Sequence, residues 1–146
     1  MLGLIQRVSS ASVSIDNAVV GNINQGLLLL LGIEKNDLET AADKLLQKIL
    51  NYRVFSDPEG KMNLSLQDIG GELLVVSQFT LAADTNKGLR PSFSAAASPE
   101  QAEELYDYFL TQAATALKTQ IQSGRFGADM QLMLRNDGPV TFILRS

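Results

Sequence analysis

An unbroken run of five leucines, Leu27 to Leu31, restricts the fold of this chain more than any other feature. The run is closed by Gly26 and Gly32 and is short for a helix, so it is typical of a β-strand. Successive side chains of a strand point to opposite faces, and a strand with leucine at every position is therefore buried on both faces. The run predicts a layered fold with this strand in its interior.

A long antiparallel hairpin is expected around this run. Two apolar segments, 2–15 and 18–33, are separated by Asp16 and Asn17, a pair typical of tight turns. The leucine run lies in the returning strand of this hairpin, which therefore forms the start of the sheet system.

Further strands are expected later in the chain. Residues 54–55 are predicted to form a short strand, and residues 72–82, rich in valine, leucine and phenylalanine, a longer one. Segments 130–134 and 140–144 are predicted to be two closing strands that are joined by a turn at residues 136–139.

Two helices are predicted from their capping residues and apolar periodicity. Asn36 and Glu39 form a capping-box pattern ahead of a helix over residues 37–52. Ser98 caps a second helix, which is expected to end at Gly124. Together the elements predict one α/β domain over residues 1–146, with layered, mainly antiparallel, barrel-like sheets and two principal helices on one face.

The composition excludes several kinds of chemistry. The 146 residues include no histidine and no cysteine, so the commonest general base, the commonest metal ligand and the thiol nucleophile are all missing. We expect no metal and no cofactor. Twelve Lys and Arg against sixteen Asp and Glu give a net charge of -4, which argues against tight non-specific binding along a phosphate backbone. No segment is predicted to cross a membrane, and a cytoplasmic location is expected.

Two short motifs carry a resemblance to a known family. Ser77-Gln78-Phe79-Thr80-Leu81 and the segment from Asn136 to Thr141, which reads NDGPVT, resemble the signature motifs of the D-aminoacyl-tRNA deacylases. The likeness extends over the whole chain. It implies a homodimeric proofreading enzyme that binds the aminoacylated 3′ end of tRNA and hydrolyses the ester of a D-amino acid, and of glycine, but not of an L-amino acid.

Apart from the resemblance, the residues of the first motif have an ordinary structural explanation. A serine and a threonine on a strand are more often hydrogen-bonded or solvated residues than nucleophiles. If the motif is a strand, Gln78 and Thr80 share one face and Ser77 lies on the other, so Gln78 and Thr80 form the better pair of pocket residues. The backbone N–H groups of Phe79 and Thr80 are candidate donors to an oxyanion.

By itself, the Gly138-Pro139 dipeptide is most simply a hairpin turn. The resemblance implies instead a cis bond that reaches into the active site of the other subunit. There its carbonyls would accept hydrogen bonds from the substrate's ammonium group, and the backbone would exclude an L side chain by clash. The resemblance also implies that Arg7, otherwise a strand residue, supports this loop.

Four further residues are assigned to the site. Phe126 and Met130 are more often core residues, but the resemblance places them at the pocket wall near the aminoacyl group. Lys87 and Arg90 lie in the segment that follows the first motif. They are ordinary surface charges or, in our interpretation, contacts to tRNA phosphates.

The sequence leaves three mechanisms open. An RNA-assisted hydrolysis, in which the ribose hydroxyl next to the ester orients the water, fits a chain without histidine or cysteine. A threonine-nucleophile esterase would use Thr80 and form an acyl-enzyme. A non-catalytic module would use the same pocket only to bind an amino acid or an RNA end.

Overall fold

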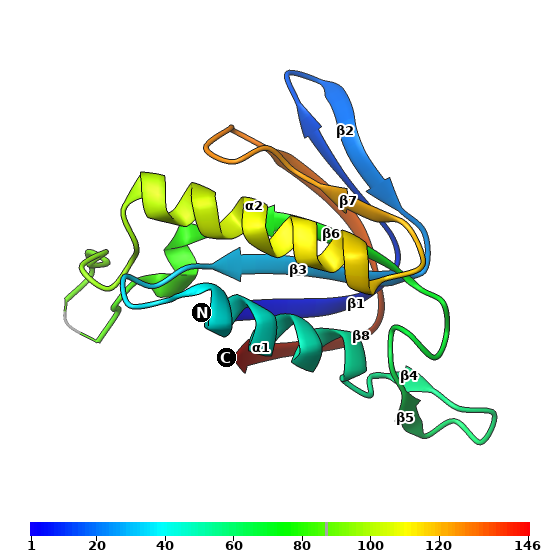
Figure 1. Ribbon diagram of the computed structural model, residues 1–146. Helices are drawn as coiled ribbons and strands as arrows, with labels where there is room; N and C mark the ends of the chain where they lie inside the picture. The colour runs from blue at the N-terminus through cyan, green and yellow to red at the C-terminus, as the bar shows by residue number, and fades with distance from the viewer. Residues whose placement is uncertain (87) are drawn as a thin grey trace.

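A curved six-stranded sheet, a small two-stranded sheet and two α-helices make up the computed structural model, which describes residues 1–86 and 88–146 (Figure 1). The α/β class with helices on one face is thereby confirmed. In chain order the elements are β1 (Leu2–Ile15), β2 (Ala18–Ile23), β3 (Gly26–Gly32), α1 (Glu39–Asn51), β4 (Phe55–Ser56), β5 (Met62–Leu64), β6 (Glu72–Ser77), the 3-10 turn η1 (Phe79–Ala82), α2 (Pro99–Ala116), β7 (Ile121–Ser123) and β8 (Gln131–Arg145).

The predicted long hairpin is confirmed. Asp16 and Asn17 have positive φ angles of 50° and 64°, the left-handed conformation that a tight hairpin turn requires. The returning chain pairs antiparallel with β1 throughout, but it breaks into β2 along the second half of β1 and β3 along the first half. The break allows β1 to bend, so the sheet curves.

Strand β8 pairs with the opposite edge of β1, and the prediction of two closing strands joined by a turn is wrong. Gln6 pairs with Thr141 and Val8 pairs with Asn136, both antiparallel and in the same direction. Residues on both sides of Gly138-Pro139 therefore pair with one partner strand. The dipeptide lies in a bulge of a single continuous strand because β1 is long enough to hold both halves.

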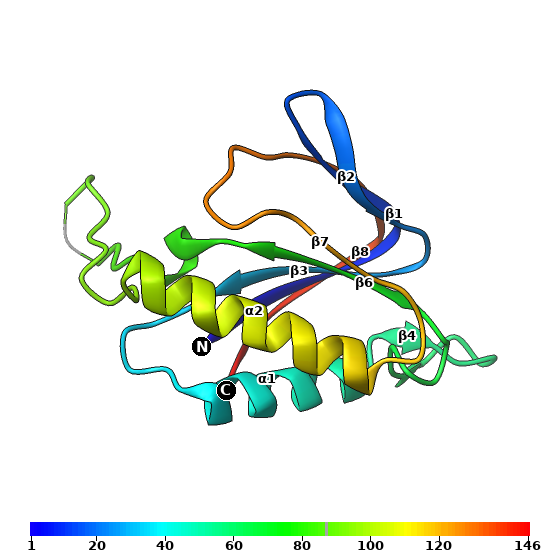
Figure 2. The ribbon, with the colours of Figure 1, turned by 45° about the horizontal axis from the view of Figure 1, so that its top comes forward.

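The two helices are crossovers between parallel strands. α1 lies in the connection from β3 to β6, and α2 in the connection from β6 to β7, and both strand pairs are parallel. The strand order advances in one direction from β3 to β7, and right-handed crossovers therefore place both helices on the same face. Figures 1 and 2 show α1 and α2 next to each other on the same side of the sheet. At the far edge β7 contacts β2, so the sheet is nearly closed.

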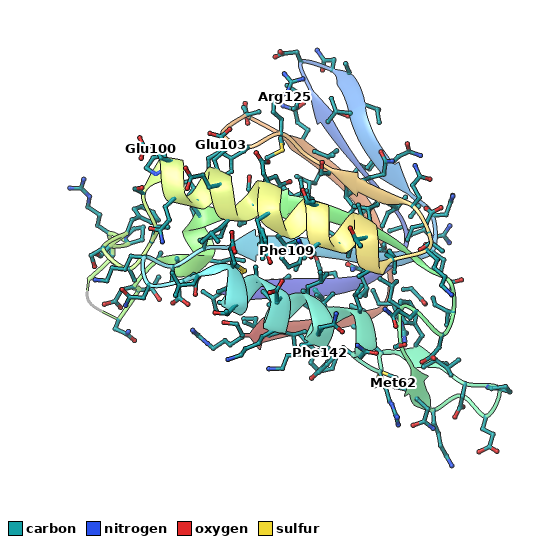
Figure 3. All side chains as sticks on the ribbon, in the orientation of Figure 1. Met62, Glu100, Glu103, Phe109, Arg125 and Phe142 are labelled. Carbon is teal, nitrogen blue, oxygen red and sulfur yellow. The ribbon has the colours of Figure 1, made fainter. Side chains whose placement is uncertain are left out.

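The leucine run is buried on both faces, as predicted. Leu27, Leu29 and Leu31 belong to the core beneath the helices, where Phe109 of α2 is fully buried (Figure 3). Leu28 points the other way, into a smaller core inside the curve of the sheet. Alternation along one strand thus divides five leucines between two cores.

The first predicted helix begins slightly later than expected, and its capping box does not form. The N-cap is Leu38, which contributes no side-chain hydrogen bond, and Glu39 is the first helical residue. Asn36 is not the cap. Asp37 instead accepts a hydrogen bond from the Glu34 amide at 2.7 Å, so the carboxylate ahead of the helix holds the preceding turn.

The second helix is capped as predicted, because the Ser98 hydroxyl accepts a hydrogen bond from the Gln101 amide at 3.3 Å. Its predicted end at Gly124 is wrong. The helix ends at Ala116, because the following Ile121–Ser123 segment leaves it to pair with β6.

The short strand expected at residues 54–55 corresponds to β4, which pairs with β5 in a small hairpin that projects from the body (Figure 1). Asp57 holds its turn, since the carboxylate accepts hydrogen bonds from the amides of Glu59 and Lys61 and from the Asn63 side chain. These bonds hold the pKa of Asp57 below its ordinary value.

Candidate active site

The first motif begins at the point where β6 leaves the sheet. β6 pairs with β3 as far as Ser77, which lies opposite Leu31, and β3 itself ends at Gly32. Beyond Ser77 there is little strand left to pair with. The expectation of one strand over residues 72–82 is therefore wrong in its last part, where Phe79–Ala82 form the turn η1.

This turn changes how the polar side chains of the motif are arranged. Nε2 of Gln78 donates a hydrogen bond to Oγ1 of Thr80 at 2.7 Å. The two side chains meet as expected, but through a turn instead of a shared strand face. The hydroxyl of Thr80 is thus bound to an amide, which has no capacity to act as a base.

A pocket with a volume of about 480 Å³ opens beside the turn. It brings Ser77, Gln78 and Phe79 next to Phe126 and Met130, five of the residues selected from the sequence. Its walls come from the end of β6, the start of η1, the start of α2 and the segment that leads into β8, and are formed by Val76, Ser77, Gln78, Phe79, Ala97, Pro99, Ala102, Phe126, Gly127, Ala128, Met130 and Leu132.

Several wall residues were missed from the sequence. Ala97, just before α2, and Pro99 and Ala102, in its first turn, line the pocket, as do Gly127 and Ala128 from the segment before β8. Small residues without functional groups carry no chemical signal. Only their position facing the motif makes them part of the pocket, and their small size leaves space for a ligand.

Phe79 lines this pocket, and the backbone amides of Phe79 and Thr80 follow each other at the start of the turn beside it. They are the first N–H groups of η1, a position at which the turn provides no acceptor for them. Within residues 1–86 and 88–146, neither amide donates a hydrogen bond to another protein group. Both are therefore available to an oxygen atom of a ligand.

Gly138-Pro139 is a cis peptide in the β8 bulge, and it lies outside the pocket of its own chain. Arg7 binds the neighbouring backbone: its Nε donates to the Asp137 carbonyl at 2.9 Å, and Nη1 donates to the Val54 carbonyl at 2.5 Å. Gly138 has a φ of 141°, and a Cβ atom there would lie 2.7 Å from the Val140 amide nitrogen. The bulge has no room for a side chain at this position.

Of the two basic residues proposed for tRNA contacts, the structure describes Arg90 but not Lys87. Arg90 is exposed in the loop between η1 and α2. Lys87 lies outside the described residues. The same loop carries Phe93, whose ring packs on Phe79 with ring centroids 5.1 Å apart.

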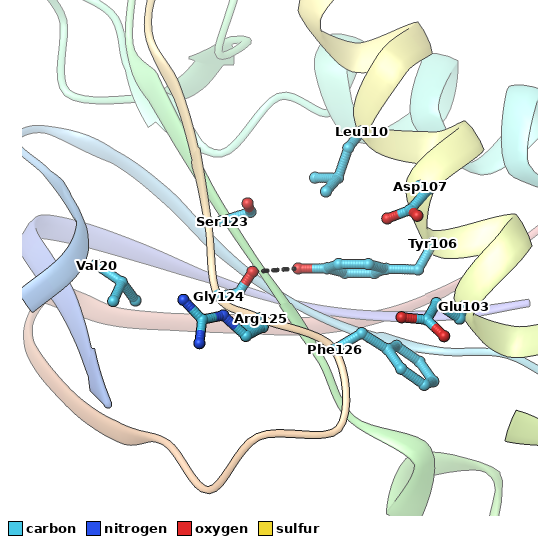
Figure 4. Close-up of a pocket in the computed structure, with 9 residues that line it drawn as sticks. All are labelled: Val20, Glu103, Tyr106, Asp107, Leu110, Ser123, Gly124, Arg125 and Phe126. Atoms are coloured by element: carbon cyan, nitrogen blue, oxygen red, sulfur yellow. Dashed lines mark hydrogen bonds between the residues drawn. The ribbon is translucent and has the colours of Figure 1, made fainter. Parts of the chain in front are cut away.

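A second depression, with a volume of about 360 Å³, lies between α2 and the segment after β7 (Figure 4). Inside it the Tyr106 hydroxyl donates to the Val75 carbonyl at 3.0 Å and lies 3.4 Å from the Gly124 carbonyl. Burial raises the pKa of Tyr106 above its ordinary value, so its hydroxyl stays protonated as the donor of these bonds. The Tyr106 hydroxyl binds backbone groups and its ring lies beside Phe126. Tyr106 therefore helps to hold Phe126 in the wall of the first pocket.

Comparison with known proteins identifies the family. The family model described as D-Tyr-tRNA(Tyr) deacylase matches residues 4–145. The D-aminoacyl-tRNA deacylase of Pseudoalteromonas translucida is 67% identical over 144 residues, which cover 99% of each chain. The chain therefore belongs to the D-Tyr-tRNA deacylase family.

Two solved structures share the fold. A protein called c-Myc DNA unwinding element binding protein superposes with a TM-score of 0.96 at 42% identity, covering 100% of this chain and 99% of its own. A probable eukaryotic D-amino acid tRNA deacylase superposes with a TM-score of 0.83 at 17% identity, covering 98% of this chain and 97% of its own, and this likeness concerns the fold alone. No helix within residues 1–86 and 88–146 has the length and apolar character needed to cross a membrane.

Proposed function

We propose that this protein hydrolyses the ester between a D-amino acid and the 3′ end of tRNA, and the glycyl ester as well, as a proofreading hydrolase of the cytoplasm. The observation that carries the proposal is the pocket beside η1. It is lined mainly by apolar groups, its wall includes Phe126 and Met130, and the turn that contributes Phe79 to it begins with two unbonded amides. Such a pocket suits an aminoacyl group with its ester carbonyl at the entrance.

Hydrolysis in this pocket needs no titratable side chain. In the proposed mechanism the N–H groups of Phe79 and Thr80 donate hydrogen bonds to the carbonyl oxygen of the ester. This oxygen gains negative charge when water attacks the carbonyl carbon. The ribose 2′-hydroxyl beside the ester orients that water. The proton passes through solvent to the ribose oxygen that leaves, and the products are a free amino acid and tRNA.

Chirality is proposed to be read by the Gly138-Pro139 bulge of a second copy of the chain. The carbonyls of the bulge would accept hydrogen bonds from the substrate's ammonium group, and its backbone would occupy the direction in which an L side chain points. Glycine, without a side chain, would be accepted. Arg7 supports this role because it holds the carbonyl of Asp137, next to the bulge.

A homodimer is proposed because the bulge lies outside the pocket of its own chain. β8 is an edge strand that pairs only with β1 among the described residues. Met133 is 77% exposed on it and Ile143 is 65% exposed. A long edge strand with exposed apolar side chains favours contact with a second chain.

The two alternatives receive less support. A nucleophilic threonine requires an adjacent base. The side-chain partner of Thr80 within the described residues is the Gln78 amide, which is not a base. A binding module would need only the pocket, and nothing in its geometry favours binding without turnover over hydrolysis.

Release of the amino acid from tRNA charged with D-Tyr, L-Tyr or glycine tests the proposal. We expect rapid release of D-Tyr and glycine and no acceleration for L-Tyr. Equal release of both enantiomers would contradict the chirality filter. Tight binding of D-Tyr-tRNA without release would identify a binding module instead.

A further inference from the structure

Two aromatic rings pack against each other, with tilted planes, beside the candidate active site. Phe79 lines the pocket and is 59% exposed, and Phe93 packs on it at a centroid distance of 5.1 Å and an interplanar angle of 50°. Phe93 is itself 41% exposed. The pair therefore forms a partly exposed aromatic surface that joins the lining of the pocket to the loop between η1 and α2.

The loop holds Phe93 in place. Asp84 and Ser92 exchange two backbone hydrogen bonds, with lengths of 2.8 and 3.0 Å, just before the ring. The carbonyl of Phe93 accepts a hydrogen bond from the Ala96 amide at 3.0 Å. Further along, the Ala97 amide donates to the carbonyl of Ile33 and anchors the loop to the body. The ring is thus presented by a fixed backbone, which lowers the entropic cost of binding a partner on its face.

The charge of the protein increases the importance of such a surface. A net charge of -4 leaves little capacity for a broad grip on phosphates. Bases can instead be held by stacking on aromatic faces, which tolerates any base and needs no positive charge. Arg90 is exposed in the same loop, so the loop also carries a positive charge that a phosphate could approach.

We propose that Phe93 is a stacking site for the base of the nucleotide that precedes the terminal adenosine of the RNA. This inference rests on the proposed function, because it takes the aminoacyl group to occupy the pocket and the ester to lie at the amides of Phe79 and Thr80. The Phe79 ring then borders the terminal nucleoside. Phe93, one ring further out, faces the nucleotide before it.

Three substrates of increasing length test this assignment. They are D-tyrosyl adenosine, the D-tyrosyl ester of the two 3′-terminal nucleotides, and full-length D-Tyr-tRNA. Loss of one base stack weakens binding between about 5-fold and about 150-fold. For Phe93→Ala we expect KM to rise by that factor for the two longer substrates, with kcat little changed. We expect KM for the adenosine ester to change much less.

Two further variants separate stacking from packing. Phe93→Leu retains an apolar side chain against Phe79 but has no aromatic face, so it should behave as Phe93→Ala does. Phe93→Trp retains an aromatic face, so its KM for the longer substrates should stay close to that of the wild-type protein. Leu89→Ala, which changes a fully exposed apolar residue of the same loop, is the matched control and should leave all three substrates unaffected.

The outcomes distinguish the inference from the function on which it rests. If the wild-type protein hydrolyses none of the three substrates, the proposed function fails. If it hydrolyses them and Phe93→Ala raises KM equally for all three, the ring contacts the terminal nucleoside and the assignment is wrong. If Phe93→Ala raises KM for none of them, or Phe93→Leu is fully active, stacking at this ring is excluded.

Discussion

Arg7 and Asp137 lie 130 residues apart in the chain, yet Nε of Arg7 donates a hydrogen bond to the Asp137 carbonyl at 2.9 Å and lies 3.2 Å from its carboxylate. Nη1 of the same guanidinium reaches the Val54 carbonyl. One side chain therefore links β1, the segment before β4 and the bulge of β8. The geometry needs a planar fork of donors on different nitrogens, which lysine does not have.

Arg7→Lys should accordingly be costly despite the retained charge. We expect the free energy of unfolding to fall by about 1.5–3 kcal/mol, the range for hydrogen bonds that involve a charged group. Discrimination between D- and L-aminoacyl esters should weaken, because the bulge loses its support. Urea unfolding and paired D and L assays measure both effects. Arg135→Lys, an exposed change on β8, is the control and should shift stability by no more than about 0.5 kcal/mol.

Gly138→Ala should lower the hydrolysis of D-esters by about 100-fold, the scale of a misplaced catalytic contact. A Cβ atom there would lie 2.7 Å from the Val140 nitrogen and 2.8 Å from its Cγ2, so the bulge has to move. Gly60→Ala is the matched control, since Gly60 also has a positive φ but no atom within 4 Å of the added methyl group. Circular dichroism should show both variants folded. Wild-type turnover by a folded Gly138→Ala protein would refute the carbonyl role of the bulge.

Thr80→Ala should keep measurable activity. Removing a catalytic nucleophile costs on the order of 10⁶ in kcat, whereas losing one neutral hydrogen bond of about 1 kcal/mol lowers the rate about fivefold. Rapid quench followed by mass spectrometry should find no acyl group on the protein. An acyl group trapped on Thr80 would establish the threonine-nucleophile mechanism instead.

A substrate that ends in 2′-deoxyadenosine, with the amino acid on the 3′ oxygen, should be hydrolysed far more slowly than its ribose counterpart. The described pocket offers no histidine or cysteine to orient the water, so the proposed mechanism assigns that task to the 2′-hydroxyl. Single-turnover rates with both substrates measure the difference. Equal rates would remove the RNA from the catalytic step.

Ile143→Asp should dissociate the proposed dimer, because it places a charge on the exposed surface of the β8 edge strand. Sedimentation should then report a monomer, and activity should fall with it. Val19→Asp is the control, since Val19 is 62% exposed on β2 and should tolerate the charge without a change of assembly. Dilution of the wild-type protein gives an independent measurement, and full activity in a dilute monomer would contradict a site shared between subunits.

Local chemistry in the sequence was sufficient for much of the fold. The turn at Asp16-Asn17 depends on two residues that tolerate positive φ, and the start of α2 depends on the Ser98 hydroxyl. The leucine run predicted a strand that is buried on both faces, whatever its position in the sheet. Each of these features acts within a few residues, so a local pattern is enough to predict it.

Only the tertiary structure decided the features that depend on a distant partner. The segment around Gly138 has the sequence of a hairpin turn, but it is a bulge because β1 is long enough to pair with the chain on both of its sides. β6 ends at Ser77 because its neighbour β3 ends there, and the chain then forms the turn at whose start the amides of Phe79 and Thr80 have no partner among the described residues. Ala97 and Ala102 line the pocket only because α2 packs beside that turn. Pairing length and packing are properties of the assembled sheet, and no local pattern of residue types encodes them.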